Sequence, residues 1–305
     1  MNYKPEGMLY AGRENQRLIA SPEGLAEAME KGLILEAPVS VCTGSHDLVL
    51  ELPCARGIIP REEGAVGITE GTTRDIALIS RVGKIVCFKV TELALAEDGG
   101  LTAMLSRKAA QEECLERFTD KLLPGDIIDV RVTHPERFGC FVDMGCGLPS
   151  LIPIDMISVS RISHPSDRFA VGQLLRAAVA SRSGRRICLT HKELLGTWQE
   201  NADRFSAGET VSGIVRSVEE YGIFVELAPN LAGLAELREG VSPGQAVSVY
   251  IKAIIPEKMK IKLIIVDRAA VSPERSEPEY FYRGSRIDRW VYSTPESPRL
   301  IETVF

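Results

Sequence analysis

Two aromatic pairs with the same spacing are the clearest candidates for chemistry in this chain. They are Phe138-Gly-Cys-Phe141 and Tyr221-Gly-Ile-Phe224, and each is followed by Val and an acidic residue. In a strand, positions three apart point to opposite faces, so only one ring of each pair could enter a core. A Gly after the first aromatic permits a local twist or bulge that brings both rings to one outer face. The alternative is one core ring with a scattered surface aromatic, but recurrence in the same register favours two outward rings that can stack on planar groups.

Other residue types give little indication of catalysis. The four His residues are not in a C-x-x-C or H-E-x-x-H context, and the chain has no G-x-S-x-G elbow, no Walker loop and no G-x-G-x-x-G after a strand. The seven Cys are scattered and mostly lie in apolar runs, which is typical of buried free thiols. We therefore expect a protein that is not an enzyme and has no metal and no cofactor.

Internal repeats indicate the elements that hold the aromatic pairs. Gly125-Asp126-Ile127 and Gly208-Glu209-Thr210 each open an alternating apolar run, followed by a polar turn, the aromatic segment, a glycine-bearing run and two more alternating runs. An eroded copy with the same five runs precedes them, from LILEAPVSV to LTAMLSRK. Five short strands with a longer connection between the third and fourth predict a small Greek-key barrel. The expected fold is all-β, with three such barrels in tandem.

Helical patterns separate the predicted barrels. SRKAAQEECLERFTDKL and HKELLGTWQENADRF contain strong helix formers, and Ser21-Pro22-Glu23 predicts a helix start with a stop at Gly32. The expected domains are an N-terminal segment with a short helix (1–30), a degenerate barrel (31–108), a helical linker (109–121), a second barrel (122–193), a helical linker (194–206), a third barrel (207–268) and a C-terminal tail (269–305).

Charge is unevenly distributed along the chain. The net charge is −6, yet the segment 121–194 has ten Lys and Arg against seven Asp and Glu, a net charge of +3. The segments 31–108 and 207–268 each have a net charge of −1. A polyanion should therefore favour the second barrel. The chain has no apolar run long enough to cross a membrane and no signal-peptide pattern, so we expect a cytoplasmic protein without a membrane partner.

The repeated motifs resemble a known family. The series of [Phe/Tyr]-Gly-x-Phe-Val-[Asp/Glu], Gly-Leu, Gly-Gln-x-[Leu/Val] and [Arg/Lys]-Ile-x-Leu is similar to the S-one RNA-binding domain, the repeat of bacterial small-subunit ribosomal protein S-one. The segment from CLTHKELLG to IFVEL and the tail RIDRWVYSTPESPRLIETVF resemble the shortened S-one-like proteins of clostridial-type bacteria. The resemblance implies OB-fold barrels.

The resemblance also implies where RNA would bind. Both aromatics of the second strand would lie on the outer barrel face and stack on unpaired bases, and a cation just before the fifth strand's Ile-x-Leu run would contact phosphate. The implied RNA-binding residues are Phe138, Phe141, Tyr221, Phe224, Arg186 with its neighbours Arg182 and Arg185, and Lys260, with Arg137 and His134 as a wider footprint.

The chain departs from the family pattern at several positions. A family His in the third strand is replaced by Pro153 in the second repeat and by Glu236 in the third, and the acidic replacement should weaken phosphate binding. In the first repeat the aromatic positions are His46 and Val49, and the fifth-strand cation is missing. We therefore expect the second repeat to bind RNA most strongly and the first to serve as a spacer or protein contact.

The function implied by the resemblance is binding of single-stranded RNA without sequence-specific readout. The implied partners are mRNA and the small ribosomal subunit, with no small-molecule substrate. The alternative is a protein-interaction scaffold whose barrels have lost RNA affinity, which the acidic total charge favours. The aromatic tail would either add Arg283, Arg286, Arg289 and its rings to the RNA surface, or dock on a barrel or a ribosomal partner.

Overall fold

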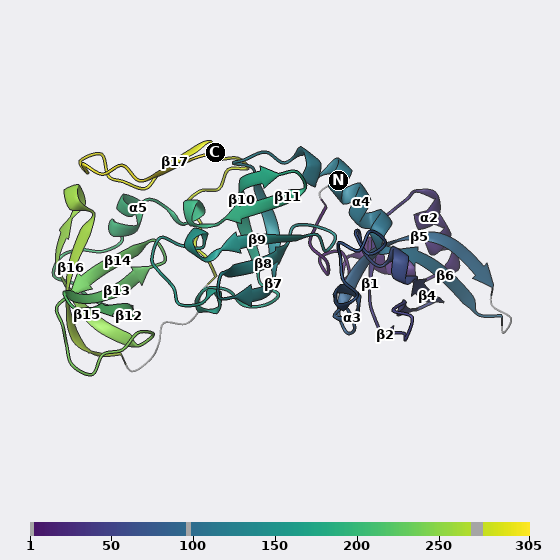
Figure 1. The fold of residues 1–305 in the computed structure, drawn as a ribbon, viewed down its shortest axis with the longest axis horizontal. Coiled ribbons are helices and arrows are strands. Elements are labelled where there is room, and N and C mark those ends of the chain that lie inside the picture. The colour runs from purple at the N-terminus through teal and green to yellow at the C-terminus, as the bar shows by residue number, and fades with distance from the viewer. Residues whose placement is uncertain (1–2, 96–98, 270–276) are drawn as a thin grey trace. The chain divides into compact units, whose positions relative to one another are not determined.

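The computed structural model describes residues 3–95, 99–269 and 277–305 (Figure 1). The chain divides into two compact units, one made of Met1–Leu122 with Asp143–Pro149 and the other of Leu123–Val142 with Ser150–Phe305. Residues 270–276, part of the predicted tail, lie outside the described residues. No helix in the described ranges is long and apolar enough to cross a membrane.

The first repeat forms a six-stranded sheet with the order β1-β5-β6-β4-β3-β2. Its elements are β1 (Leu35–Pro38), β2 (Val41–Cys42), β3 (Leu48–Leu52), β4 (Ala55–Ile59), β5 (Ile85–Leu95) and β6 (Leu101–Ser106), with the short helix α3 (Ile76–Ile79) between β4 and β5. Alternation buries Leu48, Leu50, Phe88 and Leu105 in one core.

The predicted first strand of this repeat is broken into two short pieces. β1 pairs with β5, whereas β2 pairs with β3, so the two pieces lie at opposite edges of the sheet. The residues between them continue the hydrogen bonding, because Val39 N donates to Lys84 O at 3.0 Å and Ser40 N donates to Val49 O at 2.8 Å. One bent strand thus contacts both neighbours, as the first strand of a barrel must.

Two helices of this unit lie where the sequence predicts them, whereas the helix nearest the N-terminus was not predicted. α1 (Arg13–Ile19) precedes α2 (Pro22–Glu30), and the Ser21 hydroxyl accepts a hydrogen bond from Gly24 N at 3.1 Å as the N-cap of α2. α4 (Arg107–Arg117) follows β6 and is capped by Ser106.

The second and third repeats close into five-stranded barrels, as predicted. The second contains β7 (Ile127–Glu136), β8 (Gly139–Asp143), β9 (Pro149–Pro153), β10 (Leu174–Ser183) and β11 (Arg186–Thr190). The third contains β12 (Thr210–Glu219), β13 (Gly222–Ala228), β14 (Leu231–Ala235), β15 (Ala246–Ile255) and β16 (Lys260–Arg268). In both, the third strand pairs in parallel with the fifth, which requires the long connection after the third strand. The fold is a tandem array of OB-type repeats.

The predicted helix after the second barrel is shorter than expected. A 3-10 turn (Lys192–Leu195) and α5 (Trp198–Ala202) are separated by Gly196, which has a φ of 86°. A right-handed helix cannot continue through this backbone conformation, so the pattern of helix formers gives two short pieces.

The C-terminal tail docks on its own unit. β17 (Arg289–Val291) pairs with β18 (Glu302–Val304), and Trp290 and Tyr292 are buried. Ile287 N donates to Gly125 O before the second barrel, and the Tyr292 hydroxyl donates to Asn230 O in the third at 2.7 Å. Of the two roles left open by the sequence, docking therefore applies to these rings.

Candidate nucleic-acid interface

Both aromatic pairs lie on the outside of their barrels with the same geometry. Phe138 is 57% exposed and Tyr221 is 70% exposed, while Phe141 and Phe224 are half-buried. The ring centroids are 5.9 Å apart at 87° in the first pair and 6.1 Å apart at 88° in the second. Each pair is an edge-to-face arrangement that leaves ring surface open to solvent.

The first ring of each pair lies in a turn, not in the strand. The expectation that both aromatics belong to the second strand is wrong, because Phe138 and Tyr221 are the last residues of two-residue turns before β8 and β13. Strand alternation therefore does not apply to them. The register shift nearest the second pair is in the partner strand, between Val215 and Ser217 of β12.

The glycine after each turn is required by a close approach of the third strand. A Cβ atom at Gly139 would lie 2.6 Å from Ile152 O, and one at Gly222 would lie 2.6 Å from Ala235 O. Both glycines therefore serve inter-strand packing. The two rings of each pair meet on one face, with the first ring in the turn and the second in the strand that follows.

Cationic groups of the second barrel gather at the β10–β11 hairpin. Arg186 is exposed at the first position of β11, Arg185 is exposed in the turn, and the Arg182 side chain donates to Gly184 O at 2.9 Å. β11 joins β9 with Cys188 opposite Leu151, and alternation places Arg186 on the same face as Cys188.

Phe141 of β8 lies on the same face of the second barrel as Arg186 and Cys188. Ile154 N donates to Phe138 O at 3.0 Å, and continuing this antiparallel register places Phe141 opposite Leu151. Phe141, Leu151 and Cys188 thus form one row across β8, β9 and β11, with Arg186 two residues from its end.

The third barrel has a lysine in this row. Phe224 pairs with Leu234, and Leu234 pairs with Lys262, which is exposed. The predicted cation, Lys260, is also exposed and lies two residues earlier on the same face. Lys262 was not among the predicted site residues, although alternation from Lys260 along KIK was a signal that could have found it.

The remaining predicted residues differ in their surroundings. Arg137 is exposed in the turn beside Phe138, where the third barrel has Glu220 beside Tyr221. The His134 ring contacts the Glu136 carboxylate at 2.7 Å, so an acidic neighbour already occupies its Nε2. Glu236 is exposed after β14.

The first repeat lacks this arrangement. His46 has a left-handed backbone with a φ of 69° and lies 3.6 Å from Asp75, while Val49 is buried in β3. Neither residue offers an open ring beside a second one. The geometry of this repeat agrees with the loss of aromatics in its sequence.

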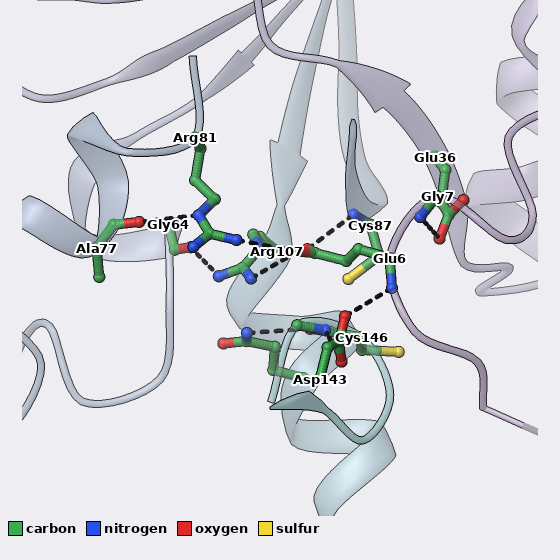
Figure 2. Close-up of polar contacts among 12 residues, drawn as sticks. Glu6, Gly7, Glu36, Gly64, Ala77, Arg81, Cys87, Arg107, Asp143 and Cys146 are labelled. Carbon is green, nitrogen blue, oxygen red and sulfur yellow. Dashed lines mark hydrogen bonds and ion pairs between the residues drawn. The ribbon is translucent and has the colours of Figure 1, made fainter. Parts of the chain in front are cut away.

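The N-terminal unit instead contains a buried charged cluster (Figure 2). The Glu6 carboxylate accepts hydrogen bonds from Arg107 Nε at 2.6 Å, from Arg107 Nη2 at 3.0 Å and from Cys87 N at 3.1 Å, and Glu6 N donates to Asp143 Oδ2 at 2.7 Å. Burial opposes the charge of Glu6, but Arg107 and then Arg81 hold its pKa below the ordinary value. Burial and the nearby Glu6 charge raise the pKa of Asp143 to about 7.

This buried charged cluster is a structural element. Arg107 is only 3% exposed, and its remaining donor Nη1 contacts Gly64 O at 3.2 Å. Its hydrogen bonds are directed at the protein, which leaves no open face for a large ligand.

Comparison with known proteins identifies relatives of the chain. No protein-family model matches the chain. It is 30% identical over 260 residues to small ribosomal subunit protein bS1 of Staphylococcus aureus, an alignment that covers 79% of this chain. The chain is a homologue of bS1. The bS1 of Staphylococcus epidermidis gives 30% identity over 266 residues and 80% of this chain. The chain spans 63% and 64% of the lengths of these two bS1 relatives.

Two solved structures show weaker similarity to this bS1 homologue. A multidomain protein with nucleic acid binding domains from Streptococcus pneumoniae is 15% identical, with coverage of 79% of this chain and 76% of that chain and a TM-score of 0.26. A chain from the a/eIF2alpha-aDim2p-rRNA complex of Pyrococcus horikoshii is 17% identical, with coverage of 27% and 51% and a TM-score of 0.23.

Proposed function

We propose that the chain binds single-stranded RNA on the aromatic faces of its second and third barrels and helps to hold mRNA on the small ribosomal subunit. The observation that supports this most is the recurrence of one arrangement. In each barrel, an edge-to-face aromatic pair lies outward on the same face as a cation of the fifth strand, Arg186 in one and Lys260 in the other. Homology to bS1 supports the ribosomal role.

Stacking and phosphate contacts would contribute to RNA binding in different ways. Stacking on an exposed ring contributes about 1 to 3 kcal/mol per base and requires an unpaired base, so it favours single strands. Contacts between cations and phosphates release counterions, so affinity should fall as salt rises. Neither term reads base identity, and we propose binding without sequence preference.

The first test measures RNA binding by fluorescence anisotropy. A labelled, unstructured oligomer should bind the full chain more tightly than a duplex of the same length. Replacement of Phe138, Phe141, Tyr221 and Phe224 by Ala should weaken binding at least about tenfold, because up to four stacking contacts are lost. Tyr250→Ala is the matched control, since Tyr250 is an exposed ring on β15 outside either pair. An unchanged affinity of the fourfold variant would refute RNA binding at these faces.

A second test addresses the ribosomal role. The chain should co-sediment with small subunits that carry mRNA, and nuclease treatment should release it. If the chain stays with the small subunits after nuclease treatment, the protein-interaction scaffold is favoured, because the chain would then be held by protein contacts.

A further inference from the structure

A cavity lies between the third barrel and the C-terminal tail. It has a volume of about 610 Å³ and contains Phe224 of the aromatic pair in its wall. The β15–β16 hairpin contributes Lys258 and Lys260, and the C-terminal tail contributes Tyr292 and Arg299. A cavity of this volume lies within the range of small-molecule sites, about 300 to 1,000 Å³.

The tail wall of this cavity is fixed by specific contacts. Thr294 Oγ1 donates to Pro256 O, in the β15–β16 hairpin, at 2.8 Å. The Tyr292 hydroxyl donates to Asn230 O at 2.7 Å, and Tyr292 O accepts from Trp198 N at 3.1 Å. Thr294 and Tyr292 are both buried, so the segment that contains Arg299 is anchored against the barrel at its start.

The side chains that line the cavity suit a ligand that has an aromatic ring and a negative charge. Phe224 supplies a ring for stacking, and Met259 and Ile301 add apolar surface. Lys258, Lys260 and Arg299 supply three exposed cations against one acid, Glu257. In the part of the chain that the structure describes, none of these three cations has an acidic partner within ion-pair distance.

We propose that the C-terminal tail completes a nucleotide pocket on the third barrel. A base of single-stranded RNA stacks on Phe224, and its flanking phosphates lie among Lys258, Lys260 and Arg299. The inference rests on the proposed RNA-binding function and adds to it that the tail, through Arg299, belongs to the binding site. It also places three cations on a barrel that has the acidic residues Glu220 and Glu236.

The test uses the full chain with Phe138→Ala and Phe141→Ala, so that binding reports on the third barrel. Anisotropy of a short unstructured RNA oligomer is measured with and without Arg299→Gln. We expect Arg299→Gln to weaken binding about 3- to 10-fold and to reduce the slope of log affinity against log salt by about 0.7, the effect of one phosphate contact. Arg289→Gln is the matched control, because Arg289 lies in the same tail but pairs with Glu302 at 2.7 Å and does not line the cavity.

Two outcomes would overturn the inference. One is an unchanged affinity with Arg299→Gln, and the other is an equal loss with Arg289→Gln, which would indicate a general effect of tail charge. Adding Tyr221→Ala and Phe224→Ala to the same background separates this failure from failure of the proposed function. If these two changes weaken binding but Arg299→Gln does not, only the role of the tail is wrong. If neither matters, RNA binding by the third barrel is wrong as well.

Discussion

Lys262 lies in the same cross-strand row as Phe224, because Leu234 pairs with both residues. The equivalent row of the second barrel ends in the uncharged Cys188, opposite Leu151. The two barrels thus have equivalent aromatic pairs, but their charged side chains lie at different positions. The second has Arg137 beside its first ring, and the third has Lys262 in the row.

The second barrel should contribute more to RNA affinity than the third. Phe138→Ala with Phe141→Ala is expected to weaken binding of an unstructured oligomer more than Tyr221→Ala with Phe224→Ala. The reason is charge, because the second barrel has Arg137 beside its first ring where the third barrel has Glu220. Glu236 adds another negative charge to the third barrel. Fluorescence anisotropy on both double variants compares them, and equal or reversed losses would show that these charges do not set the order.

Lys262 should contribute one phosphate contact. Lys262→Gln is expected to reduce the salt slope of RNA binding by about 0.7, and Cys188→Lys should increase it by about the same amount. The measurement is anisotropy over a series of salt concentrations. Lys84→Gln is the control, because it removes the same charge from the first repeat, which has no aromatic pair. A slope that responds equally to Lys84 and Lys262 would indicate only a net-charge effect.

His191 should make the C-terminal unit less stable in mild acid. Its Nδ1–H donates to Ile157 O at 3.0 Å, its Nε2 accepts from the Tyr280 hydroxyl at 3.3 Å, and burial lowers the pKa of His191 to about 4. The unfolded chain, with a His pKa of about 6.5, binds the proton more readily between these values. Stability should therefore fall as the pH drops from about 6.5 to about 4, by about 3 kcal/mol.

The variant His191→Gln isolates this contribution. Both Trp residues, Trp198 and Trp290, lie in the C-terminal unit, so urea unfolding followed by Trp fluorescence reports on it. The acid-dependent loss of stability should be smaller in His191→Gln than in the unchanged chain. His134→Gln, at an exposed site, should keep the full dependence. Parallel pH profiles for all three proteins would contradict the assignment.

Glu6 should be required for the stability of the N-terminal unit. Glu6→Gln leaves the buried Arg107 charge without its carboxylate, and loss of one partner of a buried pair costs about 3 to 5 kcal/mol. Urea unfolding followed by circular dichroism measures the loss. Glu27→Gln removes a carboxylate from exposed ion pairs with Arg17 and Lys31 and should leave the curve unchanged. Similar curves for Glu6→Gln and the unchanged chain would show that Arg107 finds other partners.

The sequence by itself determined the strands and their order in the second and third repeats. Period-two alternation and glycine-bearing turns are local properties, so runs such as DIIDVRVTH and KIKLII predict strands without knowledge of their neighbours. Recurrence of the aromatic pairs at a fixed offset then indicated which rings remain outside a core.

Only the tertiary structure decided which side chains meet. Alternation shows which face Lys262 occupies, but the pairing of β14 with β16 is what places it in line with Phe224. The salt bridge between Glu6 and Arg107 and the docking of Tyr292 beside Asn230 likewise depend on close approach of distant segments. Such contacts depend on strand register and packing between segments far apart in the chain, which a local pattern does not encode.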